Sequence, residues 1–356
     1  MLAFLAAAGT AAAQLGLAYG LGILVWVPQQ AELADAAWAA GLAWTVWVAA
    51  VAVVVGATVG DRSAGSVYSG PFVRLLGRLT QVLAAALGAC VTVPLVAVPT
   101  QQVEIVDSFA PYLLAGIYAA AGVVIGLLIA AIALASAAVA TNVFATSVFI
   151  WGVAVVARAT GDGQAEVTQL GIWQFTEQGP KWQSFYIPGA LLMLGGALLI
   201  GGLAAFPSAG RGASRFSVTI SGLAGPTVVA ASYTLAAPRP GHATFEQLSA
   251  FYTSPYMMVA GLVGSALVAA AGSGSKRRTA GTSAAHPTSP APHMARTGAQ
   301  AGTPHVAANA PVPAPRLTPS AGRRSEPLPP SPGAVAAKAS VPASSRAYPD
   351  NDPRRS

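Results

Sequence analysis

Charged residues are scarce in this sequence. They make up 9% of its 356 residues, whereas a typical soluble domain carries about 25%. Hydrophobic residues account for 54% of the chain, and the mean hydropathy is +0.58. A soluble globular enzyme is therefore a poor fit to this composition. A chain that is embedded in a membrane fits it well.

Residues that bind metals or form disulfides are also few. The single cysteine, Cys90, excludes an internal disulfide, and the sequence has no Cys-x-x-Cys pair for zinc or an iron–sulfur cluster. Of the four histidines, only His242 precedes residue 275. The sequence also lacks a phosphate-binding GxxxxGK[ST] motif. We therefore expect no metal site, no cofactor and no ATPase activity.

Ionisable residues are absent from the centre of every long apolar run. This absence disfavours a proton-coupled or sodium-coupled pump, because such pumps place ionisable groups within the membrane. It also disfavours an intramembrane protease. The weakest of three functional hypotheses is an outer-leaflet enzyme that uses carboxylates of the segment 158–185, namely Asp162, Glu166 and Glu177. No histidine accompanies them, and we do not expect an enzyme.

Long apolar runs predict eight transmembrane helices, since a spanning helix needs roughly 20 apolar residues. The run from Pro111 to Ala157 has no charge. As one helix it would reach about 70 Å, so we expect it to turn between Ser136 and Asn142. The predicted spans are Leu2–Val27, Ala36–Val59, Leu79–Val98, 111–135, 141–157, Tyr186–Phe206, Ser217–Ala237 and Pro255–Gly272. The predicted fold is an all-α polytopic membrane bundle over residues 1–274.

The distribution of basic residues predicts how the bundle is oriented, because cytoplasmic loops are enriched in Lys and Arg. The loops after the second and sixth spans and the exit of the eighth are basic, so both termini are expected in the cytoplasm; the residues are Arg62, Arg74, Arg78, Arg211, Arg215, Lys276, Arg277 and Arg278. An aromatic belt is predicted at the opposite interface, formed by Trp26, Trp38, Trp173, Trp182, Phe185, Tyr186, Phe251, Tyr252 and Tyr256.

Residues 275–356 are predicted to be a disordered basic tail. From Gly272 onward the chain contains 15 of its 27 prolines, and residues 276–356 carry 11 basic against 3 acidic residues. Such a segment cannot bury a hydrophobic core. We expect Lys276, Arg277 and Arg278 to contact anionic headgroups of the bilayer. The tail could also recruit a cytoplasmic protein, and we expect no nucleic-acid partner.

Small residues at helical spacing predict close helix packing. The pairs Gly16/Gly20, Gly56/Gly60 and Gly122/Gly126 each have the GxxxG spacing that lets membrane helices approach closely. Each pair is weak evidence by itself, because the chain contains 38 glycines.

The two halves of the body share a sequence pattern that suggests a parallel duplication of four helices. Ser108–Tyr112 and Ser249–Tyr256 are similar, and each follows a glutamate. The third and seventh spans are interrupted by Gly or Pro at related positions, and interrupted helices of this kind often line a central site. The candidate pocket residues are Cys90, Thr92, Pro94, Gly225, Pro226 and Thr227. The alternative is that both prolines merely kink packed helices.

The Ala/Val/Gly-rich spans, the scarcity of lysine and the Pro/Ala/Arg-rich tail resemble uncharacterised multi-pass membrane proteins of high-GC Gram-positive bacteria. The stretches Asp107–Tyr112 and Trp173–Glu177 carry part of this resemblance. It implies a location in a bacterial plasma membrane. The leading functional hypothesis is a protein that binds or transports a small neutral or lipidic solute. Its alternative is a structural or regulatory membrane component whose basic tail recruits a partner.

Overall fold

The computed structural model of the chain describes residues 1–65, 70–103, 110–160, 167–172, 181–183, 185–238 and 243–283, with side chains up to residue 271. All of these residues belong to one compact unit. They are mostly helical, and a short antiparallel pair of strands, β1 (Lys181–Trp182) and β2 (Phe185–Tyr186), accompanies the helices. The chain is therefore an all-α protein, as predicted.

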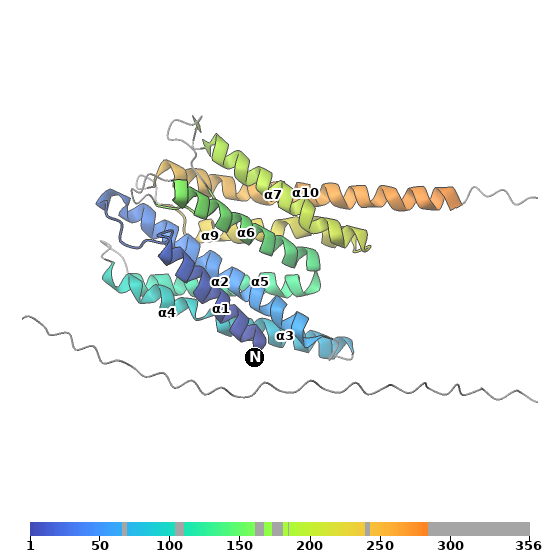
Figure 1. The fold of residues 1–356 in the computed structure, drawn as a ribbon, viewed down its shortest axis with the longest axis horizontal. Coiled ribbons are helices and arrows are strands. Elements are labelled where there is room, and N and C mark those ends of the chain that lie inside the picture. Colours follow the sequence, from blue (N-terminus) through green and yellow to red (C-terminus); the bar gives the residue numbers. More distant parts are fainter. Residues whose placement is uncertain are drawn as a thin grey trace, which may run out of the picture. The chain divides into compact units, whose positions relative to one another are not determined.

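Eight helical stretches in the described ranges are long and apolar enough to cross a membrane (Figure 1). This number confirms the eight predicted spans. Short 3₁₀ turns precede the second span (Ala31–Leu33), end the third (Pro99–Gln102) and lie within the seventh (Ser221–Leu223). The helices are α1 (Leu2–Gly20), α2 (Ala34–Ala64), α3 (Pro71–Ala89) continued by α4 (Thr92–Ala97), α5 (Pro111–Ala135), α6 (Ala137–Thr160), α7 (Ile187–Gly210), α8 (Arg215–Ile220) continued by α9 (Ala224–Leu235), and α10 (Phe245–Ser283).

The two ends of the bundle differ in composition. At the end where α2, α5, α7 and α10 begin, aromatic rings pack together, for example Trp26 on Trp38 with centroids 5.3 Å apart and Phe185 on Tyr256 at 6.1 Å. We call this the aromatic end. The opposite, basic end carries the ion pair between Arg78 and Asp61, at 3.6 Å, together with Arg62, Arg74, Arg211 and Arg215. The described members of the predicted belt thus lie at this end, but Trp26, Trp38 and Tyr186 are buried in the bundle, and Trp173 lies outside the described residues.

Helix α2 is the central helix of the bundle. It packs against α1, α3, α5, α6 and α9. In an apolar stretch of 18 residues within this span, 89% is buried inside the protein. Trp44 and Trp47 on this helix are fully buried. Because α2 is apolar on all sides, it is suited to a position enclosed by other helices.

Two of the three GxxxG pairs lie at helix contacts. Gly56 and Gly60 of α2 face Ala3 and Ala7 of α1, and a methyl group at Gly56 would collide with the backbone of α1. Gly122 and Gly126 of α5 lie in the same way against the backbone of α2. Gly16 and Gly20, by contrast, are exposed, with open space around them in the described part of the bundle. The GxxxG spacing therefore correctly predicted close helix contacts at Gly56/Gly60 and at Gly122/Gly126. At Gly16/Gly20 it predicted a contact that the described bundle does not have.

The two halves share two features of packing. In the first half the second and fourth spans, α2 and α5, have the most extensive contact, and in the second half the corresponding spans, α7 and α10, do. The third span is interrupted in both halves, between α3 and α4 and between α8 and α9. The third spans pack differently, however, since α3 lies mainly against α1 and α2, whereas α8 and α9 lie mainly against α10. The duplication stays a prediction.

The first span is shorter than predicted. Helix α1 ends at Gly20 rather than Val27, because Gly22 adopts a φ of +66° and the chain turns back. Arg158 Nε donates a hydrogen bond to the Leu21 carbonyl at 3.0 Å and so stabilises this helix end. The apolar residues that follow, such as Ile23 and Leu24, are buried in the bundle core. Their hydrophobicity reflects core packing rather than further membrane span.

The helix that forms the last span extends beyond the predicted span at both ends. Pro255, expected to begin it, lies inside α10, which starts at Phe245 and continues past Gly272 to Ser283. Proline removes the N–H donor for the carbonyl four residues earlier. That carbonyl belongs to Phe251, and it accepts a hydrogen bond from the Ser254 hydroxyl at 2.9 Å instead. This replacement explains why the helix continues through Pro255.

Candidate functional site

The first three predicted site residues lie where α3 gives way to α4. Cys90 and Pro94 are exposed on the surface of the bundle. Thr92 is fully buried, and its hydroxyl has no hydrogen-bond partner among the described residues. Helix α4 packs mainly against α5. Of this group, only Thr92 points its polar atom into the protein interior.

The other three predicted site residues lie at the start of α9. The backbone N–H of Gly225 donates to Asn142 Oδ1 of α6 at 2.8 Å. Pro226 is buried near Gly261 of α10, and the Thr227 hydroxyl donates to the Leu223 carbonyl of its own helix at 2.7 Å. These contacts supply partners where the seventh span is interrupted, as irregular backbone within a membrane requires.

The two groups of predicted site residues lie on helices that share two neighbours, α2 and α5. Helix α4 contacts α5, α1 and α2, and α9 contacts α10, α6, α2 and α5. A pocket shared by all six residues stays a prediction. Two observations agree with a polar site in the interior: Thr92 is buried, and the backbone N–H of Gly225 binds a buried side chain, that of Asn142.

Three buried polar groups, which the sequence analysis missed, lie on α2 and α6, two helices that α9 packs against. Two of them, on Asn142 and Thr146, adjoin the interruption before α9. Trp47, Asn142 and Thr146 are each at most 2% exposed. Trp47 Nε1, Asn142 Nδ2 and Thr146 Oγ1 have no hydrogen-bond partner within the described ranges. We call these three residues the polar layer. Gly225 borders it closely, because a side chain at this position would overlap the Thr146 hydroxyl.

One sequence signal could have revealed the polar layer. Asn142 is the only asparagine in the first 275 residues, and it lies in the charge-free run 111–157. We interpreted it as part of a turn. The structure confines that turn to Ser136, which has an extended backbone, and places Asn142 in the second turn of α6. A buried amide in a membrane helix is a stronger functional indicator than a turn residue.

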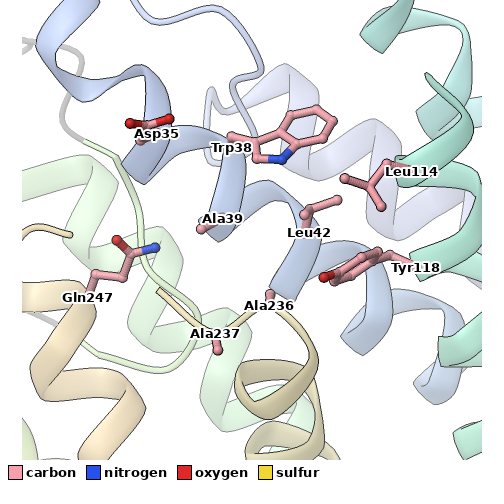
Figure 2. A pocket seen from close by; sticks show the side chains of 9 residues that line it. All are labelled: Asp35, Trp38, Ala39, Leu42, Leu114, Tyr118, Ala236, Ala237 and Gln247. Atoms are coloured by element: carbon pink, nitrogen blue, oxygen red, sulfur yellow. The ribbon is translucent and has the colours of Figure 1, made fainter. Parts of the chain in front are cut away.

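A pocket of about 90 Å³ lies at the aromatic end, where both halves of the bundle meet (Figure 2). Asp35 and Gln247 line one side, and Leu114 and Tyr118 line the other. The Tyr118 hydroxyl donates to the Leu235 carbonyl at 2.8 Å and so joins α5 to the end of α9. The remaining lining residues are Trp38, Ala39, Leu42, Ala236 and Ala237. Sequence reasoning missed this pocket, because its polar residues are far apart along the chain.

Charged groups play a small part in the interior of this bundle. Every Asp, Glu, Lys and Arg whose side chain the structure describes is at least partly exposed. Groups of three or more His, Cys, Asp or Glu side chains that could hold a metal ion are absent from the described residues. The carboxylates of the enzyme hypothesis, Asp162, Glu166 and Glu177, lie outside the described residues. The described interior is therefore polar in places but uncharged.

Comparison with known proteins found no matching family model, no matching curated protein and no matching solved structure.

Proposed function

We propose that this multi-pass membrane protein binds a small uncharged solute in the interior of its helix bundle and moves it across the bilayer. The polar layer carries this proposal. Polar groups buried in a membrane without partners are unfavourable, and those that persist there usually mark a path or a binding site. The layer is also next to the interruption of the seventh span, where a site was expected from the sequence.

The chemistry of the polar layer favours a ligand that accepts hydrogen bonds. Trp47 Nε1 and Asn142 Nδ2 can only donate, and the Thr146 hydroxyl can donate or accept. A hydroxyl or carbonyl oxygen of a neutral solute would pair with such donors. An ion would meet no buried countercharge among the described side chains, and desolvating an unpaired ion is far more costly than desolvating a neutral polar molecule.

The aromatic-end pocket gives the proposed path its first contact with water. It lies between helices of both halves, which is where transporters built from repeats often place their sites. A volume of about 90 Å³ suits a solute of a few heavy atoms, because drug-sized ligands occupy roughly 300–1,000 Å³. The basic residues favour a cytoplasmic location for the basic end, with the aromatic end facing the outside of a bacterial plasma membrane.

The length of α10 favours a second candidate function. The helix continues beyond the predicted end of its span, through residues 276–278, to Ser283. The contact expected from the sequence between Lys276, Arg277 and Arg278 and anionic headgroups belongs to this candidate. A regulatory component that recruits a partner through the following tail would use the same extension.

The transport proposal predicts solute permeability of the purified full-length protein in liposomes. Glycerol and urea are suitable probes, because both are small and neutral and carry oxygen atoms that accept hydrogen bonds. We expect proteoliposomes to equilibrate at least one of them faster than protein-free liposomes, measured by stopped-flow light scattering after an osmotic step. Sucrose, which is too large for the aromatic-end pocket, serves as the excluded control. Equal rates for both probes with and without protein would contradict the proposal.

A further inference from the structure

Residues 167–172 lie inside the bundle rather than on its surface. Gln169, Leu170 and Ile172 are at most 6% exposed, although the segment lies between the ends of two spanning helices. Gly171 has a φ of +75° and lies against Ile150 of α6 and Met193 of α7. We call residues 167–172 the re-entrant segment. Because its backbone is neither helix nor strand, its polar groups depend on contacts from the surrounding helices.

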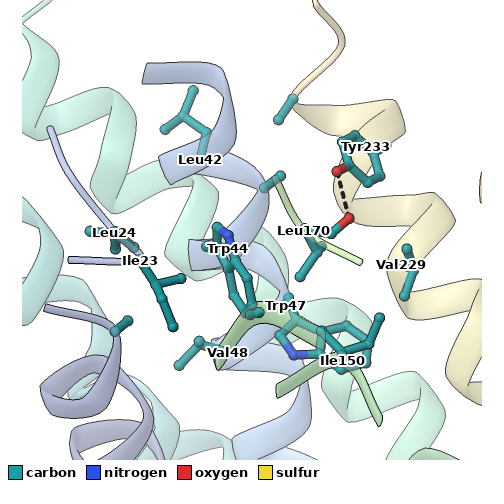
Figure 3. Packing of buried hydrophobic residues seen from close by; sticks show 14 of the residues in the cluster. Ile23, Leu24, Leu42, Trp44, Trp47, Val48, Ile150, Leu170, Val229 and Tyr233 are labelled. Carbon is teal, nitrogen blue, oxygen red and sulfur yellow. Dashed lines mark hydrogen bonds between the residues drawn. The ribbon is translucent and has the colours of Figure 1, made fainter. Parts of the chain in front are cut away.

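Two aromatic side chains hold the re-entrant segment in place. Trp44 Nε1 of α2 donates to the Thr168 carbonyl at 3.0 Å, and the Tyr233 hydroxyl of α9 donates to the Leu170 carbonyl at 2.6 Å. Figure 3 shows Leu170 and Tyr233 joined by this bond, with Trp44 beside Leu170 and with Trp47 and Ile150 below it. Both donors belong to helices that also border the polar layer or the aromatic-end pocket.

The re-entrant segment lies one helical turn from the polar layer on three different helices. On α2, Trp44 holds the segment and Trp47 belongs to the layer. On α6, Ile150 contacts Gly171 and Thr146 belongs to the layer. On α9, Val229 lies near Gly171 and Gly225 borders the layer. Each step of three or four residues is about one turn and leads toward the basic end. The segment therefore covers the polar layer from the aromatic end.

The re-entrant segment also contains a side chain, Gln169, that makes its buried position less favourable. Gln169 is 4% exposed, and neither Nε2 nor Oε1 of its amide has a partner in the described part of the chain. An unpaired buried amide is unfavourable, and water would satisfy both of its groups if the segment moved outward. The hydrogen bonds from Trp44 and Tyr233 favour the buried position, whereas Gln169 favours the exposed one.

We propose that the re-entrant segment is a movable plug that closes the polar layer toward the aromatic end and opens to admit solute. The covering of the layer is a property of the fold alone. The gating role rests on the proposed transport function. The hydrogen bonds from Trp44 and Tyr233 stabilise a closed state, and the unpaired amide of Gln169 favours an open one. A gate requires two such states of similar free energy.

The plug predicts opposite effects for two substitutions. Tyr233→Phe removes one stabilising bond and should raise the population of the open state about fivefold, as expected for one hydrogen bond. Gln169→Leu removes the opposing amide and should lower that population about tenfold. A cysteine at Leu170 or Ile172, in the full chain with Cys90→Ala, reports opening through its labelling rate with a membrane-impermeant maleimide. Nanodiscs expose both faces, so the result does not depend on orientation.

Tyr19→Phe is the matched control. The Tyr19 hydroxyl also donates to a backbone carbonyl, that of Leu95 at 3.2 Å, and it accepts a hydrogen bond from Trp26 Nε1 at 3.0 Å. Both partners are outside the re-entrant segment. We expect Tyr19→Phe to leave the labelling rate unchanged at both reporter positions. Two reporters are used because either cysteine alone could disturb the core packing. Equal labelling rates in Tyr233→Phe, Gln169→Leu and the parent would overturn the plug.

Flux measured on the same variants separates the two proposals. Labelling that changes as predicted, while neither glycerol nor urea permeates any variant, would retain the plug and overturn transport. Solute flux that is unaffected by either substitution, together with unchanged labelling, would retain transport and overturn the plug. Both proposals are supported if Tyr233→Phe raises flux and Gln169→Leu lowers it in parallel with labelling.

Discussion

Replacing Gly261 with leucine is expected to prevent folding of the bundle. Gly261 of α10 faces two other glycines, Gly201 of α7 and Gly222 in the interruption before α9, so three backbones meet at this point. A side chain on Gly261 would collide with the Gly222 carbonyl, which is backbone and cannot move aside. Overpacking a well-packed core costs about 1–3 kcal/mol and occasionally more, and we expect the upper end or beyond for leucine.

The loss of folding is measurable as the yield of monodisperse protein after extraction and as the thermal unfolding transition followed by tryptophan fluorescence. Gly261→Ala should give an intermediate loss of about 1–3 kcal/mol. Gly16→Leu is the matched control, since Gly16 lies on the exposed face of α1 with open space around it in the described bundle. A Gly261→Leu protein as stable as Gly16→Leu would contradict the three-backbone crossing.

Replacing Asn142 with leucine is expected to destabilise the bundle and to stop solute transport. The side-chain oxygen Oδ1 of Asn142 accepts a hydrogen bond from the backbone N–H of Gly225, where the seventh span is interrupted. Without it, a buried backbone donor loses its partner, which costs about 1–3 kcal/mol. The same substitution removes the Nδ2 donor of the polar layer. We therefore expect a lower midpoint of thermal unfolding together with glycerol and urea rates equal to those of protein-free liposomes.

Thr141→Val provides the comparison for Asn142. The Thr141 hydroxyl donates to the Ala137 carbonyl of the same helix, α6, at an exposed position, and such local bonds contribute little. We expect a stability change below about 1 kcal/mol and unchanged flux. If Asn142→Leu unfolds and transports like Thr141→Val, then neither the contact between α6 and Gly225 nor the Nδ2 donor of Asn142 matters.

The membrane-spanning part of the fold follows from local properties of the sequence. A run of apolar residues must bury its backbone polar groups in hydrogen bonds, and a helix does so within the run itself. This is why all eight spans were predicted. The errors concern where helices end. Arg158, which is distant in sequence, binds the end of α1. Gly22 and Ser254 are close to the affected positions, but hydropathy does not record the left-handed backbone of Gly22 or the hydrogen bond by which Ser254 lets α10 continue through Pro255.

The candidate site was harder to predict for the same reason. The sequence indicated the interruptions at Cys90–Pro94 and Gly225–Thr227, because proline and glycine leave a local signal. It gave no indication that Asn142 and Thr146 face Gly225, or that residues 167–172 fold into the bundle next to Trp44. Those relations depend on how α2, α6 and α9 pack, and neither hydropathy nor residue spacing records that packing.

The Thr146→Val variant tests most directly whether the polar layer is a solute site. Its hydroxyl is buried and without a partner among the described residues. A structural account alone predicts that valine, which removes an unfavourable polar group, raises stability by about 1 kcal/mol and changes nothing else.

The transport account predicts the same gain in stability together with a loss of solute flux, because the hydroxyl is retained for the solute rather than for folding. We therefore expect proteoliposomes with Thr146→Val to show a higher unfolding midpoint and slower glycerol or urea equilibration than the parent protein. A variant that is more stable and transports as fast as the parent would contradict the assignment of the polar layer as the solute site.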